Sequence, residues 1–233
     1  MTLIVEPVDG IGEVSPGDDL AGMLIDALSS MTLTDADVVV VTHKVVSKSE
    51  DAVVEVGEDD EDAHRRVVAA ESVRVVRRRG ELVISETRHG FICANAGVDR
   101  SNAAPGTLVL LPEDPDRSAR RIRDRIGAAL GARPAVIISD TFGRPWRRGL
   151  VDVAIGVAGM APIDDLRGTF DSYGRVLEAT EVNVADEAAA AADLVMGKAS
   201  GTCAAVIRGL AYPAGPGSIK EDVVRPASED LFR

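Results

Sequence analysis

The stretch from Ala135 to Gly149, AVIISDTFGRPWRRG, holds the residues whose types and spacing are best suited to binding a metal ion and an anionic ligand. Its first four residues, 135–138, form an apolar run of the kind that a buried strand needs. Asp140 and Thr141 follow, and a carboxylate and a hydroxyl at the end of a strand can ligate a hard cation such as Mg²⁺ or Mn²⁺. Arginines beyond them can hold phosphate or carboxylate groups in bidentate fashion; they are Arg144, Arg147 and Arg148. In the alternative interpretation Asp140 caps a turn and the arginines are solvated.

Three other segments share this arrangement of an apolar run followed by polar or charged residues. They span residues 43–48, 95–102 and 198–202. We expect each of them, like 139–148, to be a loop beside a strand, with 198–202 directly before the last strand. Together they supply acids, amides, hydroxyls and cations, and this combination predicts a site for a phosphorylated ligand and its metal.

Standard signatures of other sites are absent from the sequence. There is no GxxxxGKS or GxxxxGKT motif, and Gly10-Ile11-Gly12 is not part of a GxGxxG, so neither a P-loop nor a Rossmann site is expected. No HExxH or CxxC motif indicates structural zinc. The three histidines leave a Ser-His-Asp triad open, but no GxSxG elbow supports one.

The composition argues against several classes of protein. With 233 residues the chain forms one large domain or two small ones. A net charge of −12 argues against general nucleic-acid binding, which needs a basic face. No apolar run approaches about 18 residues, so a membrane-spanning helix is not expected. Two cysteines, Cys93 and Cys203, argue against a disulfide framework and fit a reducing cytoplasm.

Hydrophobic periodicity predicts a mixture of strands and helices. Strands are expected at residues 3–5, 37–42, 82–84, 91–94, 108–111, 135–138, 151–157, 176–182 and 204–207. Helices are expected from 18–19 to 28, over 63–79, from Asp116 or Ser118 to 130, and over 185–196. The helix over 63–79 is expected to turn its valines inward, namely Val67, Val68, Val75 and Val76. No clear linker divides the chain, and the proline, glycine and charge content from Pro213 onward indicates a tail or peripheral arm.

The order and content of these segments resemble the coenzyme F420-0:L-glutamate ligase family, also called F420 gamma-glutamyl ligase. The matching segments are PVDGIGEVSPGDDL at 7–20, DVVVVTHKVVSKSE at 37–50, NAGVDRSN at 95–102, LLPEDPDRSA at 110–119, ISDTFGRPWRRG at 138–149 and EVNVADEAAAAADLVMGKASG at 181–201. The similarity extends in the correct order over about 200 residues.

The resemblance implies a cytoplasmic, GTP-dependent ligase that joins L-glutamate to coenzyme F420-0, with further gamma-linked glutamates as an extension of the same reaction. A carboxylate is a poor acylating agent, so GTP first phosphorylates it, and the amine of glutamate attacks the acyl phosphate. Divalent cations, two Mg²⁺ or Mn²⁺, are implied for this chemistry, with K⁺ as a further cation. Neither a nucleic acid nor a membrane is an expected partner.

The family pattern also assigns roles to residues of this chain. Asp99, Asp140 and Thr141 correspond to metal ligands, and Asp99, Asp140 and Lys48 to catalytic groups. The nucleotide contacts correspond to the loop from Gly10 to Val14 (Ile11, Gly12, Glu13 and Val14), to His43, Lys44, Lys48 and Asn102, and to the closing segment with Lys198, Ser200, Gly201 and Thr202. The alternative roles are structural: a turn for Asn102, a surface cation for Lys48 and a cap for Thr141.

The expected fold is mixed α/β (α+β), with two lobes, mixed and antiparallel sheets, and an intertwined homodimer whose sites lie near the interface. Residues 1–212 would form the ligase domain and residues 213–233 the tail.

His43 and Lys44 depart from the family pattern, because relatives often have small hydroxyl residues there. We infer from charge that the three arginines at 144, 147 and 148 bind the acidic F420-0 phosphodiester or glutamate. Rival interpretations are a catalytically silent nucleotide-binding regulatory module and a ligase for another acidic acceptor.

Overall fold

A five-stranded mixed sheet forms the centre of the protein. The computed structural model describes residues 2–57, 60 and 62–231. The strand order is β1-β12-β2-β8-β9, with bounds β1 (Ile4–Pro7), β12 (Ala204–Arg208), β2 (Val38–Thr42), β8 (Ala135–Arg144) and β9 (Arg147–Ala158). Strands β2 and β8 run parallel, and the other neighbours are antiparallel. The expectation of a mixed α/β fold with mixed and antiparallel sheets is therefore confirmed.

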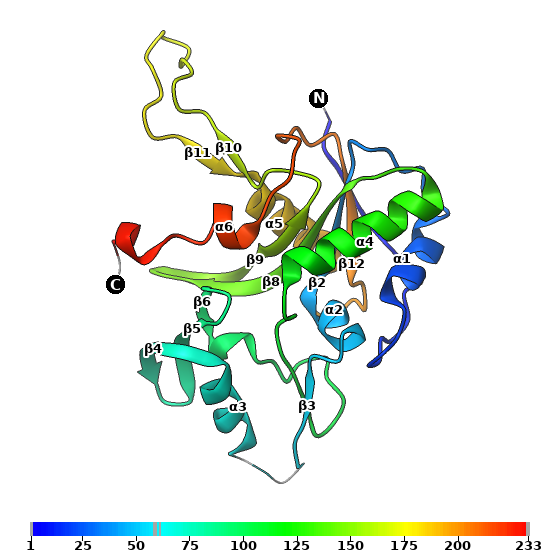
Figure 1. The fold of residues 1–233 in the computed structure, drawn as a ribbon, viewed down its shortest axis with the longest axis vertical. Helices are drawn as coiled ribbons and strands as arrows, with labels where there is room; N and C mark the ends of the chain where they lie inside the picture. Colours follow the sequence, from blue (N-terminus) through cyan, green and yellow to red (C-terminus); the bar gives the residue numbers. More distant parts are fainter. Residues whose placement is uncertain (1, 58–59, 61, 232–233) are drawn as a thin grey trace.

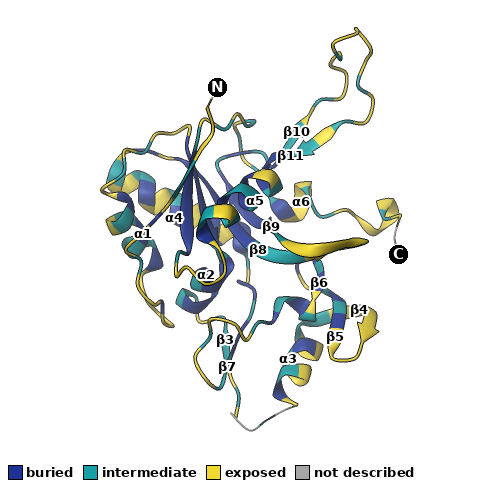
Figure 2. Cartoon of the chain, turned by 180° about the vertical axis from the view of Figure 1, so that it is seen from behind, coloured by how far each residue is buried: buried dark blue, intermediate teal, exposed yellow. Residues whose placement is uncertain are grey.

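Helices cover both faces of this sheet (Figures 1 and 2). Helix α4 (Pro115–Leu130) lies on one face and contacts α1 (Leu20–Leu28), whereas α5 (Val184–Met196) lies on the other. Because both faces are covered, the four valines of β2, residues 38–41, are fully buried. The helix ends follow local sequence: Asp114 accepts a hydrogen bond from Arg117 N at the start of α4, and Gly131 ends it in the left-handed conformation.

Smaller elements surround the central sheet. They are a three-stranded sheet of β4 (Ser72–Arg79), β5 (Leu82–Thr87) and β6 (Ile92–Ala94), a pair of β3 (Val53–Glu55) and β7 (Thr107–Val109), a pair of β10 (Ile163–Asp165) and β11 (Glu181–Asn183), the helices α2 (His43–Ser49), α3 (Ala63–Glu71) and α6 (Ile219–Asp222), and the 3-10 turns η1 (Asn95–Gly97) and η2 (Ala227–Glu229). None of the described helices has the length and apolar character that crossing a membrane requires.

Several predicted elements are wrong. Residues 63–79 do not form one helix: α3 ends at Glu71 and the chain continues as β4, which pairs with β5, so Val75 and Val76 are exposed rather than inward. The segment 43–48, predicted as a loop, is helix α2. Strand β8 continues through the predicted loop 139–148, and the strand expected at 176–182 is reduced to β11. Neither Asp116 nor Ser118 caps α4, because Asp114 holds that position.

The outer edge of the sheet, strand β9, is protected by two carboxylates. The backbone N–H of Ala154 donates to Asp186 Oδ1 at 2.9 Å, and that of Val157 donates to Asp116 Oδ1 at 2.8 Å. The same oxygen of Asp116 also accepts a hydrogen bond from Ile219 N of α6, at 3.1 Å. Unpaired edge N–H groups invite pairing with other chains, and these carboxylates satisfy them. Ile219 is buried against this edge, while the boundary predicted between residues 212 and 213 stays a prediction.

Candidate active site

Helix α2 begins at the end of β2 and places two successive side chains on two acids. In the parallel pairing of β2 with β8, Thr42 lies opposite Ser139, so the residues that follow each of them are neighbours. His43 is buried, and its Nε2 lies 3.1 Å from Asp140 Oδ1. Its Nδ1 lies 3.4 Å from Ser47 Oγ, one turn along α2. The structure therefore brings Asp140 against His43, at the point where β2 becomes a helix.

Lys44 makes the corresponding contact with Asp99. Its Nζ lies 2.7 Å from Asp99 Oδ2 and 2.5 Å from Ser101 Oγ, and Ser101 N donates to Asp99 Oδ1 at 2.7 Å. Burial raises the pKa of Asp99, but the hydrogen bonds from Lys44 and Ser101 and the charge of Lys44 outweigh it, so the pKa is lowered overall. Asp99 is thus held as a carboxylate at neutral pH, beside a cation.

One turn further along α2, Lys48 pairs with Glu13 and connects the helix to the loop of residues 10–14.

A cavity of about 630 Å³ is lined by residues of α2 and of this loop, and its volume is within the usual range for small-molecule sites. The cavity is lined by many of the predicted nucleotide contacts: Gly12, Glu13, Val14, Lys44, Lys48, Asn102, Lys198, Gly201 and Thr202. Ile11, His43, Ser200 and the three predicted metal ligands are not part of its lining.

Lysines are rare in this chain, but most of them lie at this cavity. The chain carries only four lysines, and three of them, Lys44, Lys48 and Lys198, line the cavity. Lys44 and Lys48 are also buried, which is unusual for lysine. These three lysines share the lining with three acids, Glu13, Asp152 and Asp193, and their ammonium groups favour a ligand with anionic groups such as a polyphosphate.

The wall formed by β8 and β9 contains an acid that the sequence analysis missed. Asp152 lies opposite Thr141 in the strand register, accepts a hydrogen bond from Ser139 Oγ at 2.9 Å and contacts the Thr141 hydroxyl. Lys198 contacts that same hydroxyl, and both Asp152 and Lys198 line the 630 Å³ cavity. An acid inside the apolar run Val151 to Val157 was the available signal, because a buried strand has no reason to carry one.

Asp193 of α5 faces the same wall. Burial raises the pKa of Asp193, the charge of Asp152 raises it further, and Lys198 opposes both. The cavity therefore combines carboxylates and ammonium groups at close quarters, an arrangement that suits a ligand bringing both phosphate and metal charge.

The donors present fit a hard divalent cation. Among the residues that the structure describes, no three His, Cys, Asp or Glu side chains converge into a metal-binding group. Mg²⁺ often takes one or two protein carboxylates and completes its shell with phosphate oxygens and water. Asp99, Asp140 and the Thr141 hydroxyl offer oxygen donors of this kind, and each of the two acids already faces a nitrogen group, on Lys44 and His43.

The three predicted substrate-binding arginines lie elsewhere. Arg144 and Arg147 face each other across the turn that joins β8 to β9, and Arg148 follows. All three are exposed, at the far end of the hairpin (Figure 2). The structure does not bring them to the lining of the 630 Å³ cavity, so their role as substrate ligands stays a prediction.

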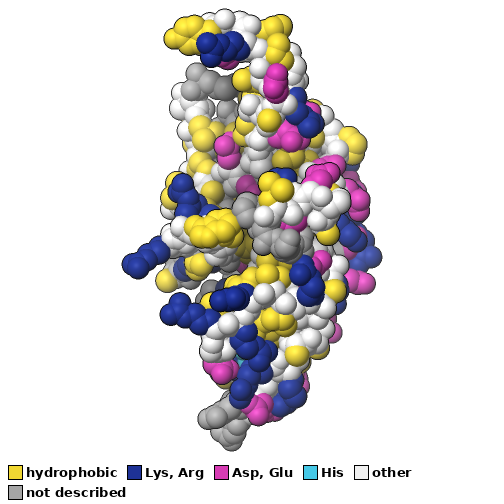
Figure 3. Space-filling view, turned by 90° about the vertical axis from the view of Figure 1, so that its left-hand side faces the viewer, with side chains coloured by type: hydrophobic (Ala, Val, Ile, Leu, Met, Phe, Trp, Pro, Cys, Tyr) yellow, Lys and Arg dark blue, Asp and Glu magenta, His cyan; other side chains and the backbone are white. Residues whose placement is uncertain are grey.

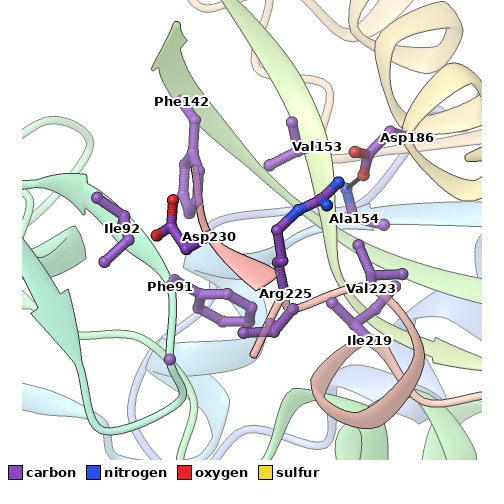
Figure 4. A pocket seen from close by; sticks show the side chains of 12 residues that line it. Phe91, Ile92, Phe142, Val153, Ala154, Asp186, Ile219, Val223, Arg225 and Asp230 are labelled. Carbon is purple, nitrogen blue, oxygen red and sulfur yellow. Dashed lines mark hydrogen bonds between the residues drawn. The ribbon is translucent and has the colours of Figure 1, made fainter. Parts of the chain in front are cut away.

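A second cavity, of about 300 Å³, opens beside the same hairpin (Figure 4). Its walls are mainly apolar, and the rings of Phe91 and Phe142 meet edge to face with centroids 6.1 Å apart. Arg225 extends between these rings and Asp186 in Figure 4. None of the predicted site residues lines this cavity, so the larger, lysine-rich cavity is the stronger candidate for the nucleotide.

Comparisons with known proteins point to one family. A sequence model described as F420-0:Gamma-glutamyl ligase matches residues 10–209. The chain is 44% identical to the coenzyme F420:L-glutamate ligase of Methanothermobacter thermautotrophicus, with 97% of each chain covered. It is 42% identical to the protein of the same name from Methanopyrus kandleri, with 100% of this chain and 98% of the relative covered. A third such protein, from Methanocaldococcus jannaschii, is 38% identical with 90% of each chain covered.

Proposed function

Since this chain belongs to the F420-0:gamma-glutamyl ligase family and is a ligase enzyme, we propose that it joins L-glutamate to coenzyme F420-0 at the expense of GTP. The relatives' names support a ligase of coenzyme F420 biosynthesis. The observation that supports nucleotide use is the cavity in which three of four lysines converge. The buried free thiols of Cys93 and Cys203 are in keeping with a reducing cytoplasm.

The proposed reaction has two steps. The terminal phosphoryl group of GTP passes to a carboxylate oxygen of F420-0, which gives an acyl phosphate and releases GDP. The amine of glutamate then attacks the acyl carbon, the bond to the phosphate oxygen breaks, and the products are the amide, inorganic phosphate and a proton. Further gamma-linked glutamates would be added in the same way. Phosphoryl transfer depends on positioning and on charge neutralisation more than on covalent help from the protein.

The residues of the cavity fit these steps. Lys44, Lys48 and Lys198 would contact the phosphate oxygens, with Asn102 and the backbone of residues 11–14 beside the nucleotide. Asp99, Asp140 and Thr141 would hold one or two Mg²⁺ or Mn²⁺ ions, with K⁺ as a further cation. Such ions neutralise the charge that develops on the phosphates. The ammonium of Lys44 lies between the proposed nucleotide cavity and the Asp99 carboxylate, so it can serve both.

One assay tests the proposal directly. The purified protein is incubated with F420-0, L-glutamate, GTP and Mn²⁺, and GDP release and product mass are followed together. We expect one GDP for each glutamate added. GTP binding without GDP release would favour the silent regulatory module, and GDP release only with a different acid would favour a ligase for another acceptor.

We further propose that the active form is an intertwined homodimer of two-lobed chains. Strand β4 is the edge of its sheet, and its valines Val73 and Val75 are 67% and 50% exposed. The hairpin of β8 and β9 adds Leu150, 66% exposed. On the face drawn in Figure 3 hydrophobic side chains lie among arginines and lysines, a mixture common in protein interfaces. Strand β4 also carries four arginines, but the backbone N–H and C=O groups of such an exposed edge can pair with a second chain.

Light scattering tests the assembly. We expect a solution mass near twice the 24.5 kDa of the chain. Val75→Asp should shift the mass towards a single chain, because it replaces an exposed apolar side chain of this edge strand with a carboxylate. The matched exposed change Leu194→Asp on α5 should not. A wild-type mass of one chain would refute the dimer.

The arginines of the hairpin support a separate prediction about substrates. Arg147→Ala should raise the apparent KM for F420-0 or glutamate about tenfold, the size of losing one charge-assisted hydrogen bond. The KM for GTP should change less, because Arg147 does not line the lysine-rich cavity. Initial rates at varied concentrations of each substrate measure both, with Arg117→Ala on α4 as an exposed control. An unchanged KM for both acidic substrates would refute this role.

A further inference from the structure

We propose that Asp152 is a positioning residue that orients the Thr141 hydroxyl, so that its oxygen is presented to a bound cation. This inference deepens the proposed function and rests on it for the identity of the cation. Asp152 belongs to none of the sequence motifs that predicted the site. It lies on β9, directly opposite Thr141 of β8, and is only 4% exposed.

The hydrogen bonds around Asp152 fix the direction of two hydroxyl groups. Ser139 Oγ lies 2.9 Å from Asp152 Oδ2, and Thr141 Oγ1 contacts Oδ1. An ionised carboxylate accepts hydrogen bonds and donates none, so both hydroxyls must direct their protons towards Asp152. The remaining lone pairs of Thr141 Oγ1 then point away from Asp152.

The ammonium group of Lys198 also contacts the Thr141 hydroxyl. The Nζ atom of Lys198, a residue that lines the large cavity, contacts Thr141 Oγ1. An ammonium group has three donors and no acceptor, so the oxygen must be the acceptor in this contact. The hydroxyl therefore donates to the Asp152 carboxylate and accepts from the Lys198 ammonium group. A metal ion would use the same lone pairs.

A purely structural role explains Asp152 poorly. The β8–β9 pairing already joins residues 141 and 152 through the strand ladder. Removing a carboxylate from water is costly, and a β-branched apolar residue would suit a buried strand position better. The carboxylate is accounted for if its charge polarises the hydroxyl that faces the cation.

Asp152→Asn separates charge from shape. The asparagine amide is close in size to the carboxylate, but the two hydroxyls bond different oxygens of Asp152, and in the amide one of these positions is an NH₂ donor, so only one hydroxyl keeps its acceptor. We expect the Kd of Mn²⁺ to rise at least about tenfold in the presence of GDP, measured by electron paramagnetic resonance of free Mn²⁺. The thermal unfolding midpoint should stay close to the wild-type value. The control is Asp186→Asn, because this partly buried acid accepts the nearby Ala154 N–H and should leave Mn²⁺ binding unchanged.

A double-mutant cycle with Thr141→Val tests whether Asp152 acts through the hydroxyl. Once the hydroxyl is absent, Asp152→Asn should weaken Mn²⁺ binding no further, so the two effects should not add. Additive effects, an unchanged Kd in Asp152→Asn, or no Mn²⁺ binding by the wild type would overturn the inference. Because neither F420-0 nor glutamate is present, a failed ligase assay would refute the proposed function without changing this result. If Asp152→Asn does not fold, Thr141→Ser and Thr141→Val test the hydroxyl through which Asp152 would act: serine should keep the wild-type Kd of Mn²⁺, valine should raise it at least about tenfold, and an unchanged Kd in the valine variant would overturn the inference.

Discussion

Replacing Asp140 with asparagine should reduce the turnover number at least about 10²-fold, the loss that follows removal of one electrostatic catalytic group. Asparagine has nearly the same shape, but it cannot carry the charge that faces His43 at 3.1 Å. The structure explains why folding should survive. Strand β8 is held on both sides by β2 and β9 through its backbone, and the Asp140 side chain does not contribute to this ladder.

Steady-state release of GDP at saturating substrates measures the effect, and thermal unfolding followed by circular dichroism checks the fold. Asp26→Asn provides the matched control, because Asp26 is an exposed acid of α1, and its turnover should equal that of the wild type. Near-wild-type turnover in Asp140→Asn would contradict the metal role proposed for this residue.

Ile137→Ala should lower the free energy of unfolding by about 2–5 kcal/mol. Ile137 is fully buried in β8, between Val40 of β2 and Val157 of β9. The sheet is covered on both faces, so neighbouring side chains cannot move far into the space that the missing atoms leave. Denaturant unfolding followed by circular dichroism gives the free energy, provided that the slope of the transition is the same for both proteins.

Ile137→Val removes a single methylene from the same place and should cost about 0.5–1.5 kcal/mol. The comparison separates cavity formation from any general sensitivity of the strand. A loss below about 1 kcal/mol for the alanine variant would mean that the sheet centre relaxes, contrary to the packing described here.

The central sheet and its helices follow from local signals. The run of four valines at 38–41 predicted a buried strand, and β2 occupies that position. The alanine-rich segment ending at Gly197 predicted a helix, and α5 ends at Met196. Burial is continuous along β2 and recurs with helical spacing along α5, so residue type and periodicity suffice to predict these two elements. The sequence motifs also predicted much of the cavity lining, because its lysines and glycines lie on segments that match the family pattern.

Where prediction failed, distant contacts decided the structure. Residues 72–79 form a strand because β5 is available as a partner, although the valine spacing also fits a helix. Residues 43–48 form a helix that buries two lysines, and this burial is compensated by distant partners, the acids at positions 13 and 99. The role of Asp152 depends on the strand register opposite Thr141, which no local pattern contains.

The arm between β10 and β11 gives the chain a place where its length can change. Residues 166–180 project from the body (Figure 1) and are closed by their own backbone bonds, from Gly168 N to Leu177 O at 2.9 Å and from Leu177 N to Thr169 O at 2.8 Å. Tyr173, near the tip, is 88% exposed. Doubling the length of such a loop costs about 0.6 kcal/mol in closure entropy. Evolution can therefore lengthen or trim this segment with little penalty, and a fluorescent reporter inserted at its tip would leave the lysine-rich cavity undisturbed.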